Sequence, residues 1–136
     1  MSDEARNVEQ LRKAYGVWSN TRGASSDHWL EICAENIAFG SLANGPPGSA
    51  YLTAYQARDE LKGYFAGLAR DWEMMEYEVD HFVAQGDRVV MLGRWKYRKT
   101  GKVVWTQKAD SWRFDGDKAV EFFEFYDTAQ VLAATA

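Results

Sequence analysis

The sequence is poor in the residues that build disulfides, metal sites and cofactor loops. Its 136 residues include one cysteine, two prolines and two histidines. With Cys33 alone, no disulfide can form within the chain. His28 and His81 stand far apart, and neither has a second His, Cys or Asp at metal-ligand spacing. The chain has no G-x-G-x-x-G, P-loop or G-x-S-x-G motif, so we expect neither a metal nor a cofactor.

Long apolar runs and an excess of positive charge are missing too. No run approaches the roughly 18 residues of a membrane span, and the start, MSDEARNVEQ, has no apolar stretch of a secretory signal. The net charge of −4 gives no footprint for nucleic acid. RWKYRKTGK is a basic stretch that fits a solvated turn, with a phosphate-binding patch as the alternative. The sequence predicts a soluble, cytoplasmic protein that binds neither nucleic acid nor membrane.

Aromatic residues, by contrast, are abundant. Trp, Tyr and Phe make up 15% of the chain, and apolar residues make up 46%. This content is more than a minimal core needs, and it indicates an aromatic-lined cavity, an apolar subunit interface, or both. The length suits a single domain over residues 1–136.

The first half of the chain predicts helices and one long loop. Ser2 can cap the first helix, whose apolar stripe is Val8, Leu11, Tyr15 and Trp18. The stretch NIAFGS predicts a brief strand, and GSLANGPPGSA, with both prolines and three glycines, predicts a loop. This loop is either a hinged flap, with Tyr51 and Leu52 at its inner edge, or an ordinary surface loop. The predicted helices span 3–19, 27–34 and 54–70, and the loop spans 40–50.

The second half predicts a meander of long strands. QGDR, KTGK and DGDK separate strand-like runs and each contain a glycine suited to a tight hairpin. Helices first and antiparallel strands afterwards indicate an α+β fold, in which a strongly curved sheet wraps the first helices as a cone. We expect Trp72, Trp95 and Trp105 on the outer face, where they would form a homodimer contact. The predicted strands span 73–84, 88–99, 103–114 and 118–127, and a last helix spans 128–134.

A carboxylate interrupts an aromatic strand in KADSWRF. Asp110, Trp112 and Phe114 share one face of that strand. Asp110 is either the polar point of a pocket, where burial would raise its pKa and let it donate or shuttle a proton, or the partner of Lys108 on the same face. In the second case the ammonium would keep the carboxylate ionised.

The chain resembles the nuclear transport factor 2-like (NTF2-like, cystatin-like) superfamily, and within it the SnoaL-like polyketide cyclases and ketosteroid isomerase-related proteins. The resemblance covers nearly the whole chain. It rests on the order of elements, on LRKAYGVWSN near the start, and on ADSWRFDGDKAVEFFEFYDTAQVLAA near the end, with FYDTAQ as its most specific part.

The resemblance implies two kinds of catalytic residue. Tyr15 and Asp110 match the tyrosine and the strand acid of ketosteroid isomerases. In those enzymes both residues donate hydrogen bonds to an enolate oxygen, the aspartate in its protonated form. The carboxylate base of those enzymes has no counterpart, since Gly40 and Ser41 stand at its place. Asp127 matches the acid that SnoaL-like cyclases use at the end of the last strand. Tyr15 could equally be a core aromatic, and Asp127 could cap the last helix.

Three functions are compatible with these residues. The leading hypothesis is an enzyme that performs acid/base chemistry on a small, hydrophobic, carbonyl-bearing ligand, of isomerase, cyclase or hydratase/dehydratase type. The alternatives are a non-catalytic small-ligand binding protein and a dimerisation module with a vestigial pocket. The predicted ligand-binding residues are Trp18, Trp29, Phe39, Tyr51, Trp112 and Phe123.

Overall fold

The computed structural model describes residues 2–41 and 57–135 of the chain. Helices come first and a meander of long strands follows, which confirms the α+β prediction. The elements, in chain order, are α1 (Asp3–Asn20), α2 (Ser26–Ile32), β1 (Cys33–Ser41), the 3-10 helix η2 (Arg58–Glu60), α3 (Leu61–Asp71), β2 (Glu73–Gln85), β3 (Arg88–Lys99), β4 (Lys102–Asp115), β5 (Lys118–Tyr126) and α4 (Thr128–Thr135).

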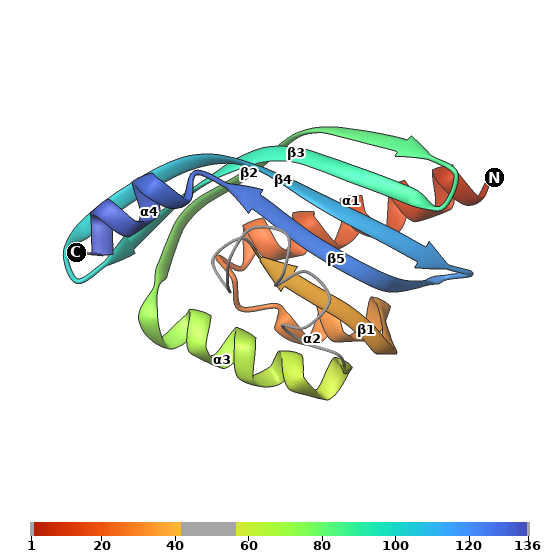
Figure 1. Cartoon of the computed structure of the whole chain (residues 1–136), viewed down its shortest axis with the longest axis horizontal. Helices are drawn as coiled ribbons and strands as arrows, with labels where there is room; N and C mark the ends of the chain where they lie inside the picture. The colour runs from red at the N-terminus through yellow and green to blue at the C-terminus, as the bar shows by residue number, and fades with distance from the viewer. Residues whose placement is uncertain (1, 42–56, 136) are drawn as a thin grey trace.

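The five strands form one curled sheet in the order β1-β5-β4-β3-β2. Strands β2 to β5 are antiparallel neighbours, whereas β1 pairs with β5 in parallel. The sheet is therefore mixed, and the antiparallel prediction holds for the meander. Figure 1 shows the long strands arching over α1 and β1, with α3 on the side opposite the arch. The predicted cone of helices inside a curved sheet is confirmed.

Helix α1 fills the concave side of the sheet. Its N-terminus is capped by Ser2, whose Oγ accepts a hydrogen bond of 3.1 Å from the Ala5 amide. Leu11, Tyr15 and Trp18 lie on the buried side, as the apolar spacing predicts. This face turns Tyr15 toward the interior of the cone.

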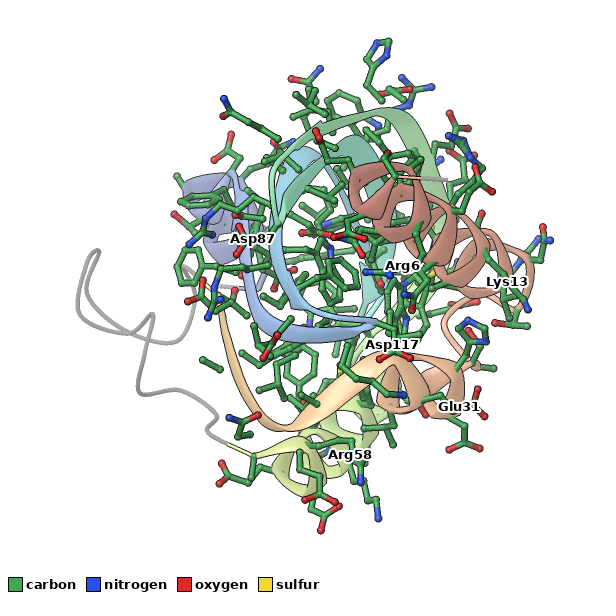
Figure 2. All side chains as sticks on the ribbon, turned by 90° about the vertical axis from the view of Figure 1, so that its right-hand side faces the viewer. Arg6, Lys13, Glu31, Arg58, Asp87 and Asp117 are labelled. Atoms are coloured by element: carbon green, nitrogen blue, oxygen red, sulfur yellow. The ribbon has the colours of Figure 1, made fainter. Side chains whose placement is uncertain are left out.

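The end of the cone near the N-terminus is closed by contacts between α1 and the turn that joins β4 to β5. Arg6 donates to the Gly116 carbonyl at 2.7 Å, and Gln10 donates to the Asp117 carbonyl at 3.0 Å. Figure 2 views the molecule from this end and shows Arg6 close to Asp117. These bonds hold α1 in a fixed position relative to β4, and so fix the relative position of side chains from the two elements.

Several predicted boundaries differ from the structure, among them the start of β1, which lies at Cys33 instead of within NIAFGS. The second helix was expected over 27–34 but ends at Ile32, because Cys33 already pairs with Ala119 in the sheet. Helix α3 begins at Leu61, after η2. The predicted flap with Tyr51 and Leu52 lies outside the described residues.

The prediction that Trp95 lies on the outer face is wrong. Trp95 pairs with buried Thr106, whereas Trp105 pairs with Lys96. Directly paired residues of antiparallel strands share one face, so Trp95 and Trp105 lie on opposite faces. Trp105 is 44% exposed on the outer face, and Trp95 points into the cone. Trp72, which was also expected outside, is half-buried at the end of α3 and lines the interior.

In the described part of the chain, none of the helices has the length and apolar character needed to cross a membrane.

Candidate active site

A cavity of about 130 Å³ lies inside the cone. Trp29 of α2 and Trp112 of β4 stack there with ring centroids 5.4 Å apart, and Phe39 of β1 stacks on Phe122 of β5 at 4.2 Å. Both pairs join a segment from the first half of the chain to a strand of the meander. The other aromatic residues of the wall are Tyr15, Trp18, Tyr64, Phe65, Trp72, Tyr77, Trp95, Tyr97 and Tyr126.

One part of the wall carries three charges that face one another. Lys108 and Asp110 are alternate residues of β4, so both point inward, and Asp110 pairs with Glu124 of β5. The ammonium Nζ of Lys108 lies 3.0 Å from Oδ1 of Asp110 and 3.0 Å from Oε2 of Glu124. The side chains of Lys108 and Asp110 are only 5% and 1% exposed. The cluster is thus a buried carboxylate–ammonium–carboxylate arrangement.

Tyr15 joins this cluster through a directed chain of hydrogen bonds. The indole Nε1–H of Trp112 donates to Oη of Tyr15 at 2.9 Å, and Oη–H of Tyr15 donates to Oδ2 of Asp110 at 2.5 Å. Because an indole nitrogen only donates, the Tyr15 hydroxyl must accept the hydrogen bond from Trp112 and direct its own O–H toward Asp110. Tyr77 also donates to Oδ2, over a longer distance of 3.4 Å.

The two oxygens of Asp110 therefore have different surroundings. Oδ2 accepts from two tyrosines, whereas Oδ1 accepts no hydrogen bond of good geometry from the described residues. The Lys108 ammonium lies beside Oδ1 as an ion pair. Of the two oxygens, Oδ1 is the one that neither tyrosine contacts by a hydrogen bond and that faces the ammonium.

Burial controls the protonation of the cluster. It raises the pKa of Asp110 to about 6, against the opposing effects of the Lys108 charge and the Tyr15 hydrogen bond. Burial is the largest single effect on Lys108 and would lower its pKa, but the acidic groups around it, Asp110 foremost and Glu124 among them, together outweigh burial and hold that pKa well above its usual value. Burial, together with the Asp110 charge, raises the pKa of Tyr15 and of Tyr77 well above 10. At neutral pH the site contains an ionised Asp110, an ammonium and neutral tyrosines.

Gly93 lets the edge strand come close to this cluster. It pairs with Lys108 on one side and with Val79 of β2 on the other. A Cβ at this position would collide with the carbonyl oxygen of Glu78 and would also crowd Met91. The missing side chain therefore permits the approach of β2, which carries Tyr77 to Asp110.

The structure brings most of the predicted site residues together. Asp110 pairs with Lys108, as one of the two sequence-based alternatives proposed, and at the same time lies in the cavity wall. Tyr15 lies beside it but donates to Asp110 itself, so the two are not a pair of free donors. The other predicted residues on the wall are Trp18, Trp29, Phe39 and Trp112.

Two predicted residues have positions away from the cavity wall. Phe123 is buried on the opposite side of β5, against Phe125, and its neighbour Phe122 lies on the cavity wall. Asp127 is exposed at the start of α4, where its Oδ1 accepts a hydrogen bond of 3.0 Å from the Gln130 amide. This geometry is the predicted helix cap, and the carboxylate is not part of the described cavity wall. Tyr51 lies outside the described residues.

Sequence reasoning missed Glu124 and Tyr77. In EFFEFY, Glu124 alternates with Phe122 and Tyr126, which is the signal that could have placed it on an inner face. Tyr77 carried no such signal, because two register shifts interrupt the alternation of β2. Cys33 lines the cavity too, and burial raises the pKa of its thiol to about 12, which leaves it inert as a nucleophile.

Among residues 2–41 and 57–135, no three His, Cys, Asp or Glu side chains gather in a way that could hold a metal ion. The charged groups of the cavity are bonded to each other and to tyrosines. Their arrangement is suited to proton transfer and to the recognition of small ligands.

Comparison with known proteins identifies the family. The model of the SnoaL-like domain matches residues 11–122, so the chain belongs to the SnoaL-like domain family. A comparison with curated protein sequences gave no match.

Solved structures support the same fold. An NTF2-like protein from Burkholderia thailandensis is 26% identical, with a TM-score of 0.74 over 93% of this chain and 95% of that one. A protein from Jannaschia sp. assigned as a SnoaL-like polyketide cyclase is 17% identical, with a TM-score of 0.77 over 98% and 94% of the two chains. An LEH-like epoxide hydrolase from M. tuberculosis is 8% identical, with a TM-score of 0.72 over 98% of this chain and 91% of that one. The last two show the fold alone.

Proposed function

We propose that the protein is an enzyme that removes and returns a proton on a small, mostly apolar, carbonyl-bearing ligand, with Asp110 as the base. The observation that carries this proposal is the state of Asp110. It is a buried carboxylate with a pKa of about 6, and its Oδ1 accepts no hydrogen bond of good geometry from the described residues. A base is most effective when its pKa lies near the working pH.

Each neighbour of Asp110 has a distinct part in this chemistry. Tyr15 and Tyr77 bind Oδ2, so the proton of a ligand would go to Oδ1, beside the Lys108 ammonium. Trp112 is a positioning residue, because its indole N–H fixes the direction in which Tyr15 donates. Lys108 keeps Asp110 ionised, and its positive charge in the cavity wall favours negative charge on a ligand oxygen.

The proposed reaction is balanced without any further reagent. Oδ1 of Asp110 takes a proton from a carbon next to the carbonyl group, and the electron pair of that C–H bond moves onto the carbonyl oxygen as an enolate. Asp110 then returns the proton to a different carbon of a conjugated enolate, or the enolate carbon attacks a second carbonyl of the ligand, whose oxygen becomes an alkoxide and takes the proton back from Asp110. The first outcome is isomerisation and the second is cyclisation, in line with the polyketide cyclase assignment of the Jannaschia protein.

A non-catalytic binding protein is the second candidate. It is favoured by the hydrogen bonds of Tyr15, whose hydroxyl already accepts from Trp112 and donates to Oδ2 of Asp110, and so has no proton left to donate to a ligand. The two candidates differ in what they require of Asp110. An enzyme needs its basicity, whereas a binder needs only its shape.

Hydrogen–deuterium exchange separates the candidates. Cyclohexanone in D₂O, followed by NMR, reports proton removal next to a carbonyl without assuming the natural ligand. We expect the wild-type protein to accelerate the exchange and Asp110→Asn to reduce it by about 100-fold or more, with cyclohexanone still bound. The exchange rate should rise with pH through about 6, as Asp110 ionises.

Asp127→Asn is the matched control, because it removes an exposed carboxylate outside the cavity wall. Exchange that survives in Asp110→Asn would disprove the assignment of the base. A wild-type protein that binds cyclohexanone without accelerating its exchange would favour the binding protein.

A further inference from the structure

The cavity holds more negative than positive charge. Among its described lining residues, Lys108 is the one cation, whereas Asp110 and Glu124 are both anions. Both carboxylates lie 3.0 Å from the same ammonium and share it. A bound ligand therefore meets a cluster with one negative charge in excess, in a buried place where electrostatic interactions are stronger than in water.

Glu124 occupies the position on Lys108 that a ligand carboxylate would need. Its side chain is 14% exposed, the most accessible of the three charged groups. A ligand anion must displace this tethered carboxylate or bind beside two carboxylates. The first removes a partner from a buried ion pair and the second places like charges together, so both weaken binding. A neutral ligand avoids both costs.

The size of the cavity limits the ligand further. A volume of about 130 Å³ is close to that of the apolar cavities of about 150 Å³ that bind benzene. Stacked aromatic pairs line it, which suits a flat ring. We infer that the cavity selects a neutral ligand of about one ring, that it rejects a carboxylate of the same shape, and that Glu124 determines this selectivity. The inference rests on the proposed function in placing the ligand in the same cavity.

Benzamide and benzoate test this directly, because they share a shape and differ in charge. Titration calorimetry at neutral pH should show that the wild-type protein binds benzamide at least about tenfold more tightly than benzoate. Glu124→Gln frees Lys108 for a ligand anion, so benzoate affinity should rise about tenfold or more while benzamide affinity changes little. Glu121→Gln is the control on the same strand, since Glu121 pairs with Arg88 and Arg113 instead.

A wild-type measurement keeps the test decisive even if Glu124→Gln does not fold. Near pH 5, protonation of Asp110 removes the excess negative charge, so the preference for benzamide over benzoate should shrink. Equal binding of the two probes by the wild type, absence of benzamide binding, or an unchanged ratio in folded Glu124→Gln would overturn the inference. The benzamide and benzoate affinities are equilibrium measurements that do not depend on catalysis. A failure of the cyclohexanone exchange experiment would therefore overturn the proposed reaction but not the inferred ligand selectivity.

Discussion

Tyr15 of α1 and Asp110 of β4 are 95 residues apart in the chain and share a hydrogen bond of 2.5 Å in the interior of the cone. The bond links the first helix to the centre of the sheet, and Trp112 sets its direction by donating to Tyr15 from the other side. The same contact thus contributes to the stability of the fold and to the protonation of the cavity.

Tyr15→Phe should affect both. The change leaves the buried Trp112 N–H without its acceptor and removes a hydrogen bond that lowers the pKa of Asp110. We expect the free energy of unfolding to fall by about 1–3 kcal/mol in urea titrations, and the pH midpoint of exchange to move upward. Tyr126→Phe, at the half-buried end of β5, should leave that midpoint in place. Unchanged stability and midpoint in Tyr15→Phe would contradict the role of this bond.

The stability of the protein should depend on pH through Asp110. Its pKa is about 6 in the folded protein and about 3.9 in an unfolded chain. Between about pH 4 and 6 the folded state therefore binds more protons at this group, and its contribution to the free energy of unfolding falls as the pH rises, by on the order of 2 kcal/mol. The difference in unfolding free energy between wild type and Asp110→Asn should change across this window. A difference that stays constant with pH would show that burial does not raise this pKa.

Asp127 should matter for helix α4 and not for proton transfer. Its carboxylate accepts from the Gln130 amide and its own amide donates to Thr106, both at the start of α4. Asp127→Ala should lower the free energy of unfolding by about 1 kcal/mol, whereas Asp127→Asn, which also caps helices well, should change it little. Both variants should retain cyclohexanone exchange. Loss of cyclohexanone exchange in folded Asp127→Asn would contradict this prediction and show that Asp127 takes part in proton transfer.

Gly93→Ala should be strongly destabilising. The added Cβ meets the backbone of Glu78 in the neighbouring strand, which cannot move aside as a flexible side chain could. Overpacking of this kind costs about 1–3 kcal/mol or more. Gly16→Ala, in the interior of α1 with open space around the new Cβ, should instead stabilise by about 0.5–1 kcal/mol. Thermal unfolding of the two variants checks the contrast, and equal effects would contradict it.

The outer face of the sheet should form a homodimer. Leu92, Ala109 and Phe125 lie in one row across three strands, and Leu92 and Phe125 are 38% and 46% exposed. An apolar row of this kind is unfavourable in water. In sedimentation experiments we expect the wild type to have the mass of a dimer and Leu92→Lys to have the mass of a monomer. The control Lys13→Glu, on α1, should remain a dimer. A monomeric wild type at micromolar concentration would disprove this prediction.

Much of this arrangement follows from local sequence. The spacing of Leu11, Tyr15 and Trp18 determines the buried face of α1, and the alternation in KADSWRF determines that Asp110 and Trp112 point the same way. Helical and strand periodicities depend on neighbours in the chain, so they can be read without knowledge of the fold. The element order was predictable for this reason and led to the cone, whereas the alternation in KADSWRF left the pairing of Asp110 with Lys108 as one of two alternatives.

The tertiary structure decided the rest, because register between strands is not a local property. The adjacent Phe122 and Phe123 could each have faced inward, and pairing with Trp112 assigned the inner face to Phe122. Pairing with Thr106 turned Trp95 inward, against the prediction. Glu124 became a partner of Lys108 only through the alignment of β5 with β4. A one-residue slip would send every one of these side chains to the opposite face, so the charge of the cavity is a consequence of strand pairing.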